Sequence, residues 1–328
     1  MNRAVSILLI AIVWTVFDPS ITRVHAQSKY PDRTIKLIIP FPAGGLFDNV
    51  GRPLAEKLKP LLGTVVIENI GGAGSSRGAL VAARAEPDGH TLLLAGNGSH
   101  VVVPLAASKP PYDPIKDFEP ISLLGTVGLA ITVHPSQPMK TLAELVEFIQ
   151  KYPGKLSFGN AGTGSLTHLT GEMFKLRASA PGIVHLPYTG GAQVVNDLVG
   201  GHVPVGVITL TSQFLELHAA GKIRMLAVTT PSRLAIAPGL PTAAETIPGM
   251  VSQNFAGVFA PKGTSKVIIE QVAAAVSKVM LDPDVQRLYS AGGFDPHLQN
   301  SPEVLRRFLD DELAKWRPVI AASGFHIK

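Results

Sequence analysis

Residues 36–48 read Lys36-Leu37-Ile38-Ile39-Pro40-Phe41-Pro42-Ala43-Gly44-Gly45-Leu46-Phe47-Asp48. The apolar run predicts a strand, the two prolines end it, and a glycine turn leads into a helix. This order directs unpaired backbone N–H groups and the positive end of a helix dipole at one point. Such a point suits a carboxylate or a phosphate.

Three residues of this stretch are candidates for ligand contact on their chemistry alone. Gly44 and Gly45 allow a close backbone approach to an anion. Asp48 lies in the first helical turn, where it either fixes the loop by accepting backbone N–H bonds or meets a cationic part of a ligand. The alternative is an ordinary strand-to-helix turn in which Asp48 only caps the helix.

A second stretch, residues 155–168, repeats the order of strand, glycine loop and helix. Thr163, Ser165 and Thr167 supply hydroxyls, which bind carboxylate oxygens without the desolvation cost of a buried Lys or Arg. His168 is either a ligand contact or a packed core residue of the helix, and we favour the second. Two such loops, far apart in the sequence, suggest one ligand held between two lobes.

Further polar residues follow other predicted strands. Asn97 and Ser99 come directly after Thr91–Ala95, and open α/β sheets bind ligands at the carboxyl ends of their strands. Tyr188 and Thr189 lie on a third glycine loop that leads into a helix. Thr209 follows the run Val203–Ile208 in the same way. We include these residues among the candidate contacts.

The chain alternates short β-like runs with helical patterns, which predicts an α/β fold with a mostly parallel sheet. The predicted strands are Ile35–Ile39, Thr64–Glu68, Thr91–Ala95, Leu129–His134, Leu156–Phe158, Ile183–Leu186, Val203–Ile208, Met225–Thr229 and Phe255–Pro261. The predicted helices are Val50–Leu61, Ser76–Ala85, Thr141–Lys151, Leu166–Leu176, Ala192–Gly200, Phe214–Ala220, Lys266–Met280, Pro283–Ala291 and Pro302–Ser323.

The N-terminal segment has the features of a secretory signal peptide. Arg3 supplies the positive charge, an apolar run extends from Ala4 to Phe17, and Val24-His25-Ala26 offers small residues for cleavage after Ala26. The alternative is an uncleaved anchor, although the run is shorter than a bilayer requires. We therefore predict an exported, periplasmic protein without residues 1–26.

The composition excludes several classes of function. The chain of 328 residues has no cysteine, which rules out thiolate metal sites and thiol nucleophiles. Its net charge of +5 is carried by basic residues scattered along the chain, so the sequence shows no nucleic-acid footprint. The histidines show no metal-ligand spacing, and we expect neither a metal nor a cofactor.

Two motifs resemble those of enzymes. Gly74-Ser75-Ser76-Arg77-Gly78 matches the nucleophile pattern G-x-S-x-G, but a true elbow follows a strand directly and the nearest strand ends near Glu68. Gly72-Ala73-Gly74 with Gly78 loosely resembles a dinucleotide fingerprint. The next strand, Thr91–Ala95, lacks the acidic residue that would hold a ribose. We discount both motifs.

Ten motifs in order resemble the periplasmic receptors of tripartite tricarboxylate transporters, the TctC or Bug family, over essentially the whole mature chain. They are Ile35–Asp48, Val65–Gly74, Pro87–Leu94, Tyr112–Pro120, Pro153–Asn160, His168–Phe174, His185–Gly191, Asp197–Val203, Ala220–Thr229 and Ala260–Thr264. The resemblance implies a two-lobed, type II-like Venus-flytrap fold, with two crossovers and a mostly parallel sheet flanked by helices in each lobe. We expect lobe 1 to comprise residues 27–128 and 252–328, and lobe 2 residues 129–251.

The resemblance also implies a function and a set of contacts. The ligand would be a small carboxylated compound, captured between the lobes by a monomeric, non-enzymatic receptor that serves membrane transport subunits. The implied contacts are Phe41, Ala43, Gly44, Gly45, Leu46, Phe47 and Asp48 in the first loop and Ala161, Gly162, Thr163, Gly164, Ser165 and Thr167 in the second. The rival functions are a ligand sensor of the same fold and, more remotely, a serine esterase that uses Ser76.

The chain departs from the family pattern at a few positions. Leu46 and Phe47 stand where small or hydroxyl residues are frequent, and Pro204 where an acidic residue is common. Residues 208–211 also lack the usual polar pattern. A less polar far end of the site would favour an aromatic or branched acid over citrate.

Overall fold

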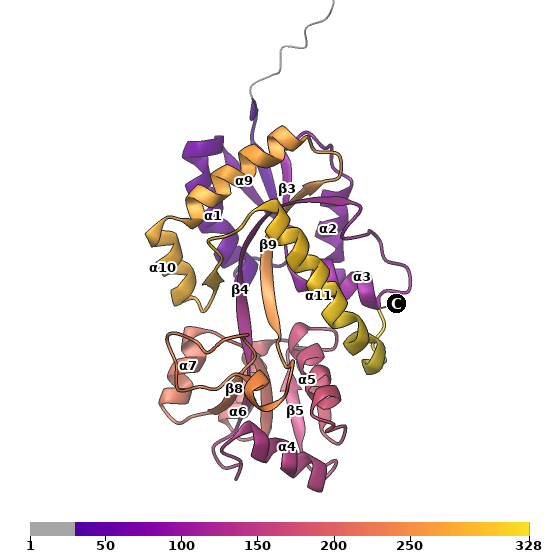
Figure 1. Ribbon diagram of the computed structural model, residues 1–328, viewed down its shortest axis with the longest axis vertical. Helices are drawn as coiled ribbons and strands as arrows, with labels where there is room; N and C mark the ends of the chain where they lie inside the picture. Colours follow the sequence, from indigo (N-terminus) through magenta and orange to yellow (C-terminus); the bar gives the residue numbers. More distant parts are fainter. Residues whose placement is uncertain (1–29, 328) are drawn as a thin grey trace, which may run out of the picture.

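The computed structural model describes residues 30–327, which form an α/β molecule with two lobes stacked along its long axis (Figure 1). Segments from both ends of the chain, indigo, orange and yellow, build one lobe. The middle of the chain, magenta to salmon, builds the other. The predicted two-lobed α/β fold is confirmed, whereas the predicted signal peptide lies outside the described residues.

Within the described residues, the first lobe contains a sheet of six strands in the order β2-β1-β3-β9-β4-β10. The strands are β1 (Ile35–Ile39), β2 (Val65–Asn69), β3 (Thr91–Ala95), β9 (Gln253–Pro261), the first part of β4 (Phe118–Val133) and β10 (Asp295–Pro296). Strand β1 is parallel to β2 and β3, but β9 is antiparallel to both β3 and β4.

The second lobe contains a sheet in the order β8-β4-β7-β5-β6. Its strands are β5 (Ser157–Asn160), β6 (Val184–Pro187), β7 (Val205–Thr209), β8 (Arg224–Val228) and the second part of β4. Strand β5 is parallel to β6 and β7, and β4 is antiparallel to β7 and β8. Each sheet is therefore mixed rather than mostly parallel, because the strands that join the lobes run against their neighbours.

Helices cover both sheets. They are α1 (Leu46–Leu62), α2 (Ser76–Ala83), α3 (Val103–Ala106), α4 (Leu142–Lys151), α5 (Leu166–Arg177), α6 (Gly191–Val199), α7 (Ser212–Ala219), α8 (Ala243–Thr246), α9 (Lys266–Met280), α10 (Pro283–Ala291) and α11 (Pro302–Ser323). Helix α11 packs against β4 of the first sheet and against α5 of the second lobe. The C-terminal helix therefore contacts both halves of the molecule.

The strand β4 is much longer than the sequence predicted. The pattern indicated a strand at Leu129–His134, yet the strand already begins at Phe118. Nearly every residue of β4 is buried, so the strand lacks the alternation that marks a half-exposed strand. Its pairing with β9 slips near Pro120 and Gly125, because proline and glycine interrupt a regular ladder.

The core occupies both faces of the sheets. Ile38 of β1 joins one cluster of buried side chains, and Leu37 and Ile39 join the other. Burial on both faces explains why β1 is a continuous apolar run. Both clusters include side chains from each lobe.

The chain segments that connect the two lobes are joined by hydrogen bonds near the point where β4 changes partners. Gly128 is the last residue of β4 to pair with β9, and Leu129 is the first to pair with β7. The Thr229 hydroxyl accepts a hydrogen bond from the Leu129 N–H at 2.9 Å and donates one to the Ser252 carbonyl at 2.6 Å. This buried threonine thus joins both connecting segments.

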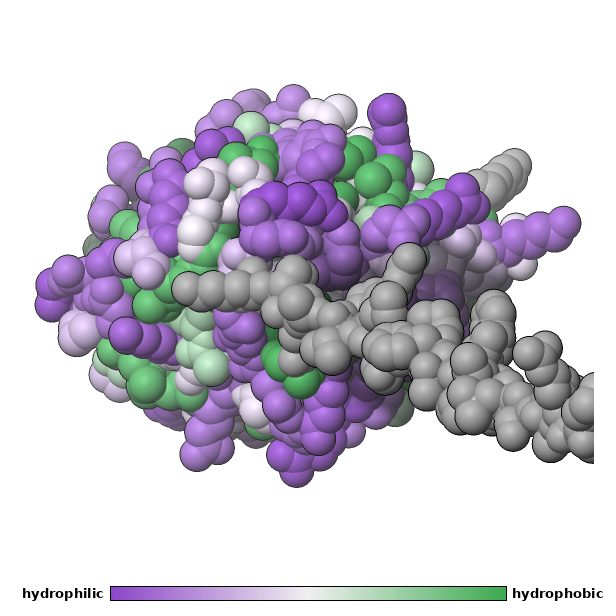
Figure 2. Space-filling model, turned by 90° about the horizontal axis from the view of Figure 1, so that it is seen from above, coloured by the Kyte–Doolittle hydropathy of each residue, from purple (hydrophilic) through white to green (hydrophobic). Residues whose placement is uncertain are grey.

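The end of the first lobe is covered largely by hydrophilic residues where it is visible, with apolar residues scattered between them (Figure 2). Across residues 30–327, the helices are either too short or too polar to cross a bilayer.

Candidate functional site

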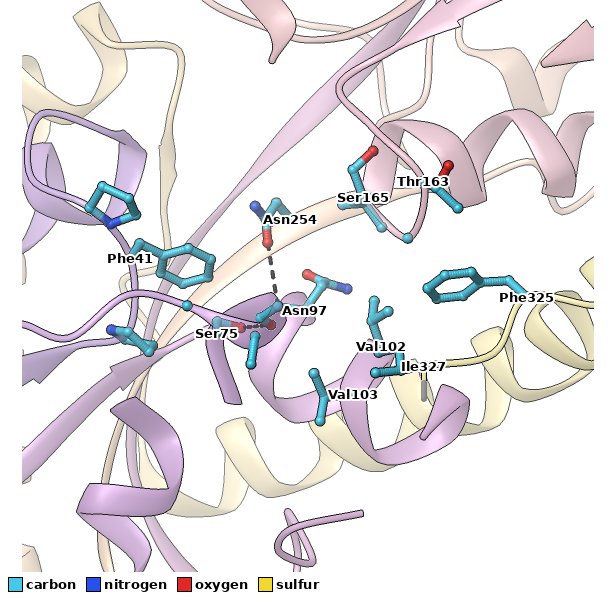
Figure 3. Close-up of a pocket in the computed structure, with 18 residues that line it drawn as sticks. Phe41, Ser75, Asn97, Val102, Val103, Thr163, Ser165, Asn254, Phe325 and Ile327 are labelled. Atoms are coloured by element: carbon cyan, nitrogen blue, oxygen red, sulfur yellow. Dashed lines mark hydrogen bonds between the residues drawn. The ribbon is translucent and has the colours of Figure 1, made fainter. Parts of the chain in front are cut away.

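A cavity of about 540 Å³ lies between loops of the two lobes (Figure 3). Two loops of the first lobe, the turn after β3, the start of β9 and the C-terminal tail approach it from one side, and the loop before α5 approaches it from the other. The lining residues are Pro40, Phe41, Pro42, Gly72, Ala73, Gly74, Ser75, Asn97, Gly98, Val102, Val103, Thr163, Gly164, Ser165, Leu166, Asn254, Phe325 and Ile327.

Asp48 holds the first loop, residues 41–48, in place by hydrogen bonds. Its carboxylate accepts hydrogen bonds from the Gly44 N–H at 2.9 Å and from Arg52 Nε at 2.8 Å. Asn69 Nδ2 donates both to Asp48 and to the Phe41 carbonyl. The bond from Arg52 is the main reason that the pKa of Asp48 lies below its usual range, and the bonds from Gly44 and Asn69 add to the effect. Of the two roles considered for Asp48, the structure supports loop fixation.

Phe47 is buried and lies outside the cavity lining, but it packs against Phe41, which lines the cavity. The two rings stack with centroids 4.2 Å apart and planes 8° from parallel. Gly45 precedes α1, and because glycine has no side chain, the helix begins without a side-chain cap. Phe41 therefore lines the cavity together with Pro40 and Pro42, and the stacked ring of Phe47 sets its position.

The loop that follows β2 has an unusual backbone. Ala73, Gly74 and Ser75 all have positive φ, at 47°, 64° and 76°. Left-handed conformations are costly for residues with a Cβ and gather at functional sites. The Ser76 hydroxyl donates to the Ala73 carbonyl at 2.8 Å, inside the turn that leads into α2. The discounted nucleophile motif is thus part of a cavity wall.

Asn97 lines the cavity and links three elements. Its Oδ1 accepts from the Phe255 N–H at 3.0 Å, and its Nδ2 donates to Glu312 on α11 at 2.9 Å. Glu312 also accepts from Trp316 Nε1 at 2.9 Å. Asn254, on β9, accepts from the Asn97 N–H through its Oδ1 at 3.4 Å.

The loop before α5 is held by its own helix. Ser165 caps α5 by accepting from the His168 N–H at 3.2 Å, and Thr167 accepts from the Ala161 N–H at 2.9 Å. The Gly164 N–H donates to His168 Nδ1 at 3.1 Å. Burial, with His185 and Lys175 nearby, lowers the pKa of His168 to about 4. A neutral His168 therefore holds the loop by accepting the Gly164 N–H, which agrees with the favoured structural role.

The C-terminal tail forms a further wall. Gly324 ends α11 with a φ of 66°, and the Ile327 N–H donates to the Ala106 carbonyl at 2.9 Å. Phe325 reaches across to the second lobe, where its ring edge lies against Gly164 so closely that a Cβ there would be 2.4 Å from the ring. The tail is thus attached to one lobe and touches the other.

The candidate residues fall into two groups. Those that line the cavity are Phe41, Asn97, Thr163, Gly164 and Ser165. Those outside the lining are Ala43, Gly44, Gly45, Leu46, Phe47, Asp48, Ser99, Ala161, Gly162, Thr167, His168, Tyr188, Thr189 and Thr209.

Several candidates outside the lining have other partners. The Ser99 hydroxyl donates to the Gly96 carbonyl, and the Tyr188 hydroxyl donates to Asp197 at 2.8 Å. The Thr189 hydroxyl donates to Gln193 at 2.7 Å. As ligand contacts, the residues of both groups stay predictions.

Sequence reasoning missed the tail, Asn254 and the valines that follow the turn after β3. Nothing local in the sequence marks where a C-terminal tail will dock. The loop Gly72–Ser75 carries a signal, its glycines, but the sequence interpretation assigns it to two enzyme-like motifs and to a family motif, not to the candidate contacts.

Among residues 30–327, those that line the cavity include neither a charged side chain nor a histidine. Its polar groups are the Thr163, Ser75 and Ser165 hydroxyls, the Asn97 and Asn254 amides, and the backbone of the glycine-containing turns. Such groups can hold a small anion by hydrogen bonds alone, with apolar surface around it.

Comparison with known proteins agrees with this architecture. The family model for the tripartite tricarboxylate transporter family receptor matches residues 50–325. Protein BugT of Bordetella pertussis is 33% identical over 302 residues, which cover 91% of this chain and 92% of BugT.

Two solved structures extend the comparison. R. palustris Rpa4515 with adipate has a TM-score of 0.77 at 30% identity, covering 90% of this chain and 99% of its own. MatC (Rpa3494) from Rhodopseudomonas palustris with bound malate has a TM-score of 0.75 at 28% identity, covering 89% and 100%. The family match, which extends over most of the sequence, shows that this chain belongs to the tripartite tricarboxylate transporter receptor family.

Proposed function

We propose that the protein binds a small carboxylate in the cavity between its lobes, without converting it, and presents it to the membrane subunits of a tripartite transporter. The observation that carries the proposal is the cavity itself, which takes glycine-containing loops from both lobes and, within residues 30–327, no charged side chain. The adipate and malate bound by two similar structures support the same class of ligand.

The choice of donors has a physical basis. A buried Lys or Arg would first have to lose its own hydration, which offsets much of its attraction for the ligand. Neutral amides, hydroxyls and backbone N–H groups lose less hydration free energy when they are buried, and they still form strong hydrogen bonds to a carboxylate. We expect Asn254, Thr163 and the backbone at 72–75 and 98 to be the main donors.

We also propose that the lobes comprise residues 27–128 with 252–328 and residues 129–251. The change of partners of β4 at Gly128 and Leu129 and the bond from Thr229 to Ser252 support these boundaries. Bending there would let a ligand shift an equilibrium between open and closed forms.

The proposal includes export to the periplasm as a monomer, with cleavage after Ala26. N-terminal sequencing of the exported protein would test the cleavage, and light scattering would test the mass. A mature protein that begins at Gln27 and has the mass of one chain is expected. An uncleaved N-terminus or a dimer would contradict this part of the proposal.

A thermal-shift screen tests the central claim. A ligand that binds only the folded state raises the melting temperature in a concentration-dependent way. We expect at least one di-, tri- or monocarboxylate to do so, while its amide does not. An amide that stabilises the protein equally would overturn anion recognition.

A matched pair of variants links the effect to the cavity. Asn254→Ala should weaken binding of the stabilising acid about tenfold, because a hydrogen bond to a charged group is lost. The control is Asn196→Ala, an exposed asparagine on α6, which should leave the affinity unchanged. Equal effects of the two variants would place the ligand elsewhere.

A further inference from the structure

The C-terminal tail, residues 324–327, is attached to the first lobe. The Ile327 N–H donates a hydrogen bond to the Ala106 carbonyl at 2.9 Å. Helix α11, which leads into the tail, is bound to the same lobe, because its Glu312 accepts a hydrogen bond from Asn97 Nδ2 at 2.9 Å. The helix and the tail therefore move with the first lobe.

Phe325 extends from this tail to the loop that precedes α5 in the second lobe (Figure 3). Its ring lies so close to Gly164 that a Cβ at that position would be 2.4 Å from the ring. The ring also meets His168 edge-on, with centroids 6.0 Å apart and planes 81° from parallel. Aromatic rings favour such edge-to-face pairs. One side chain carried by the first lobe thus bears directly on the second lobe.

The second lobe holds both partners of this ring in fixed positions. Gly164 has a φ of +82°, and its N–H donates a hydrogen bond to His168 Nδ1 at 3.1 Å. His168 is buried, and its ring packs against that of His185 with centroids 4.0 Å apart. Glycine suits position 164 for two reasons, because a side chain there would be strained by the positive φ and would collide with Phe325.

The contact joins two parts of the molecule that move apart when the lobes open. The connecting strand β4 changes partners at Gly128 and Leu129, where bending would separate the tail from the loop before α5. Phe325 would then lose its contacts with Gly164 and His168. A contact that exists in only one of two forms shifts the equilibrium toward that form.

We propose that Phe325 is a closure latch, whose contact with Gly164 and His168 raises the ratio of closed to open molecules before any ligand binds. The inference rests on the proposed motion of the lobes, and not on the class of ligand. Thr163 and Ser165, on either side of Gly164, line the cavity, so the latch holds the same loop that meets the ligand. The apparent affinity for any ligand of the closed form rises with the closed fraction.

Single-molecule fluorescence of the ligand-free protein tests the latch. Dyes on Glu86→Cys and Glu147→Cys, at one exposed position in each lobe, report the populations with high and low energy transfer. Phe325→Ala should lower the ratio of closed to open molecules about three- to tenfold, because an edge-to-face contact is lost. The control is His326→Ala, which alters an exposed neighbour and should leave the ratio unchanged.

A double-mutant cycle links the effect to this contact. Gly164→Ala should also lower the ratio, because the added methyl group collides with the ring in the closed form. In the Phe325→Ala background the same substitution should have a smaller effect, since the ring is absent. Circular dichroism would establish that each variant is folded. Additive effects of the two substitutions would show that Phe325 does not act through Gly164.

The outcomes separate the latch from the proposed function. A folded Phe325→Ala protein with the wild-type ratio would overturn the latch, and so would a ligand-free wild-type protein without a population of high energy transfer. The thermal-shift screen judges the ligand class without reference to lobe motion. If a carboxylate stabilises the protein while Phe325→Ala leaves the ratio unchanged, the latch is wrong and the proposed function stands.

Discussion

At the scale of the residue, Asp48 shows how one buried carboxylate holds a binding loop. It accepts three hydrogen bonds, from Gly44, Arg52 and Asn69, and so ties the glycine turn to α1 and β2. Asp48→Asn should lower the free energy of unfolding by about 1–3 kcal/mol, because a charged acceptor is replaced by an amide that cannot satisfy all three donors. Urea denaturation would measure the loss.

The pH dependence of this loss follows from the lowered pKa of Asp48. Because the folded pKa lies below the unfolded value of about 3.9, the stabilisation is fully present above about pH 4. It is lost as the pH falls through the folded pKa. The difference between wild type and variant should thus be constant from about pH 5 to 7 and shrink below about pH 4. The exposed Asp284→Asn serves as control, and a difference that grew on acidification would contradict this account.

Residue chemistry predicted part of the site, and the limits are physical. The role of Asp48 depends on which donors surround it, and one of these donors, Asn69, lies on strand β2, away from Asp48 in the sequence. The sequence could not identify Phe325 as a lining residue, because its position depends on a contact with Gly164, which is far away in the sequence. Hydroxyl-bearing Thr163 and Ser165 were predictable, since capping residues and glycines mark the start of α5.

At the scale of the element, the connection between lobes depends on Thr229. Its hydroxyl accepts from the Leu129 N–H of β4 and donates to the Ser252 carbonyl just before β9. Thr229→Val keeps the shape but leaves a buried N–H and a buried carbonyl without this partner. The free energy of unfolding should fall by about 1–3 kcal/mol.

Chemical denaturation of the variant would measure this effect. The control is Thr34→Val, an exposed threonine before β1, for which a change within about 0.5 kcal/mol is expected. A Thr229→Val variant as stable as the control would show that the hydroxyl does not hold the two connecting segments together.

Elements with clear local signals were predicted well. Helices α9, α10 and α11 have the predicted bounds, and α11 begins after Ser301 with proline in its first turn. In contrast, the first part of β4 was missed, because it is buried throughout and contains Pro120 and Gly125. Burial on both faces removes the periodicity on which strand prediction depends.

At the scale of the whole molecule, the cavity is assembled from segments that lie far apart in the sequence. Its walls come from loops near residues 41, 74, 98, 163, 254 and 325. The sequence indicated that two loops could share one ligand, and the structure brings Phe41 and Thr163 to the same cavity. Which further loops join them depends on the register of two sheets, which no local pattern encodes.

The two-lobed form leads to a prediction about motion. Because the chain has no cysteine, Glu86→Cys and Glu147→Cys would place one dye on each lobe at exposed positions. The acid that stabilises the protein most should increase the population with high energy transfer between the dyes, since a ligand that contacts both lobes favours the closed form. Single-molecule fluorescence would resolve the two populations. The amide of the same acid is the control and should leave the distribution unchanged. An unchanged distribution at saturating acid would mean that the ligand binds without drawing the lobes together.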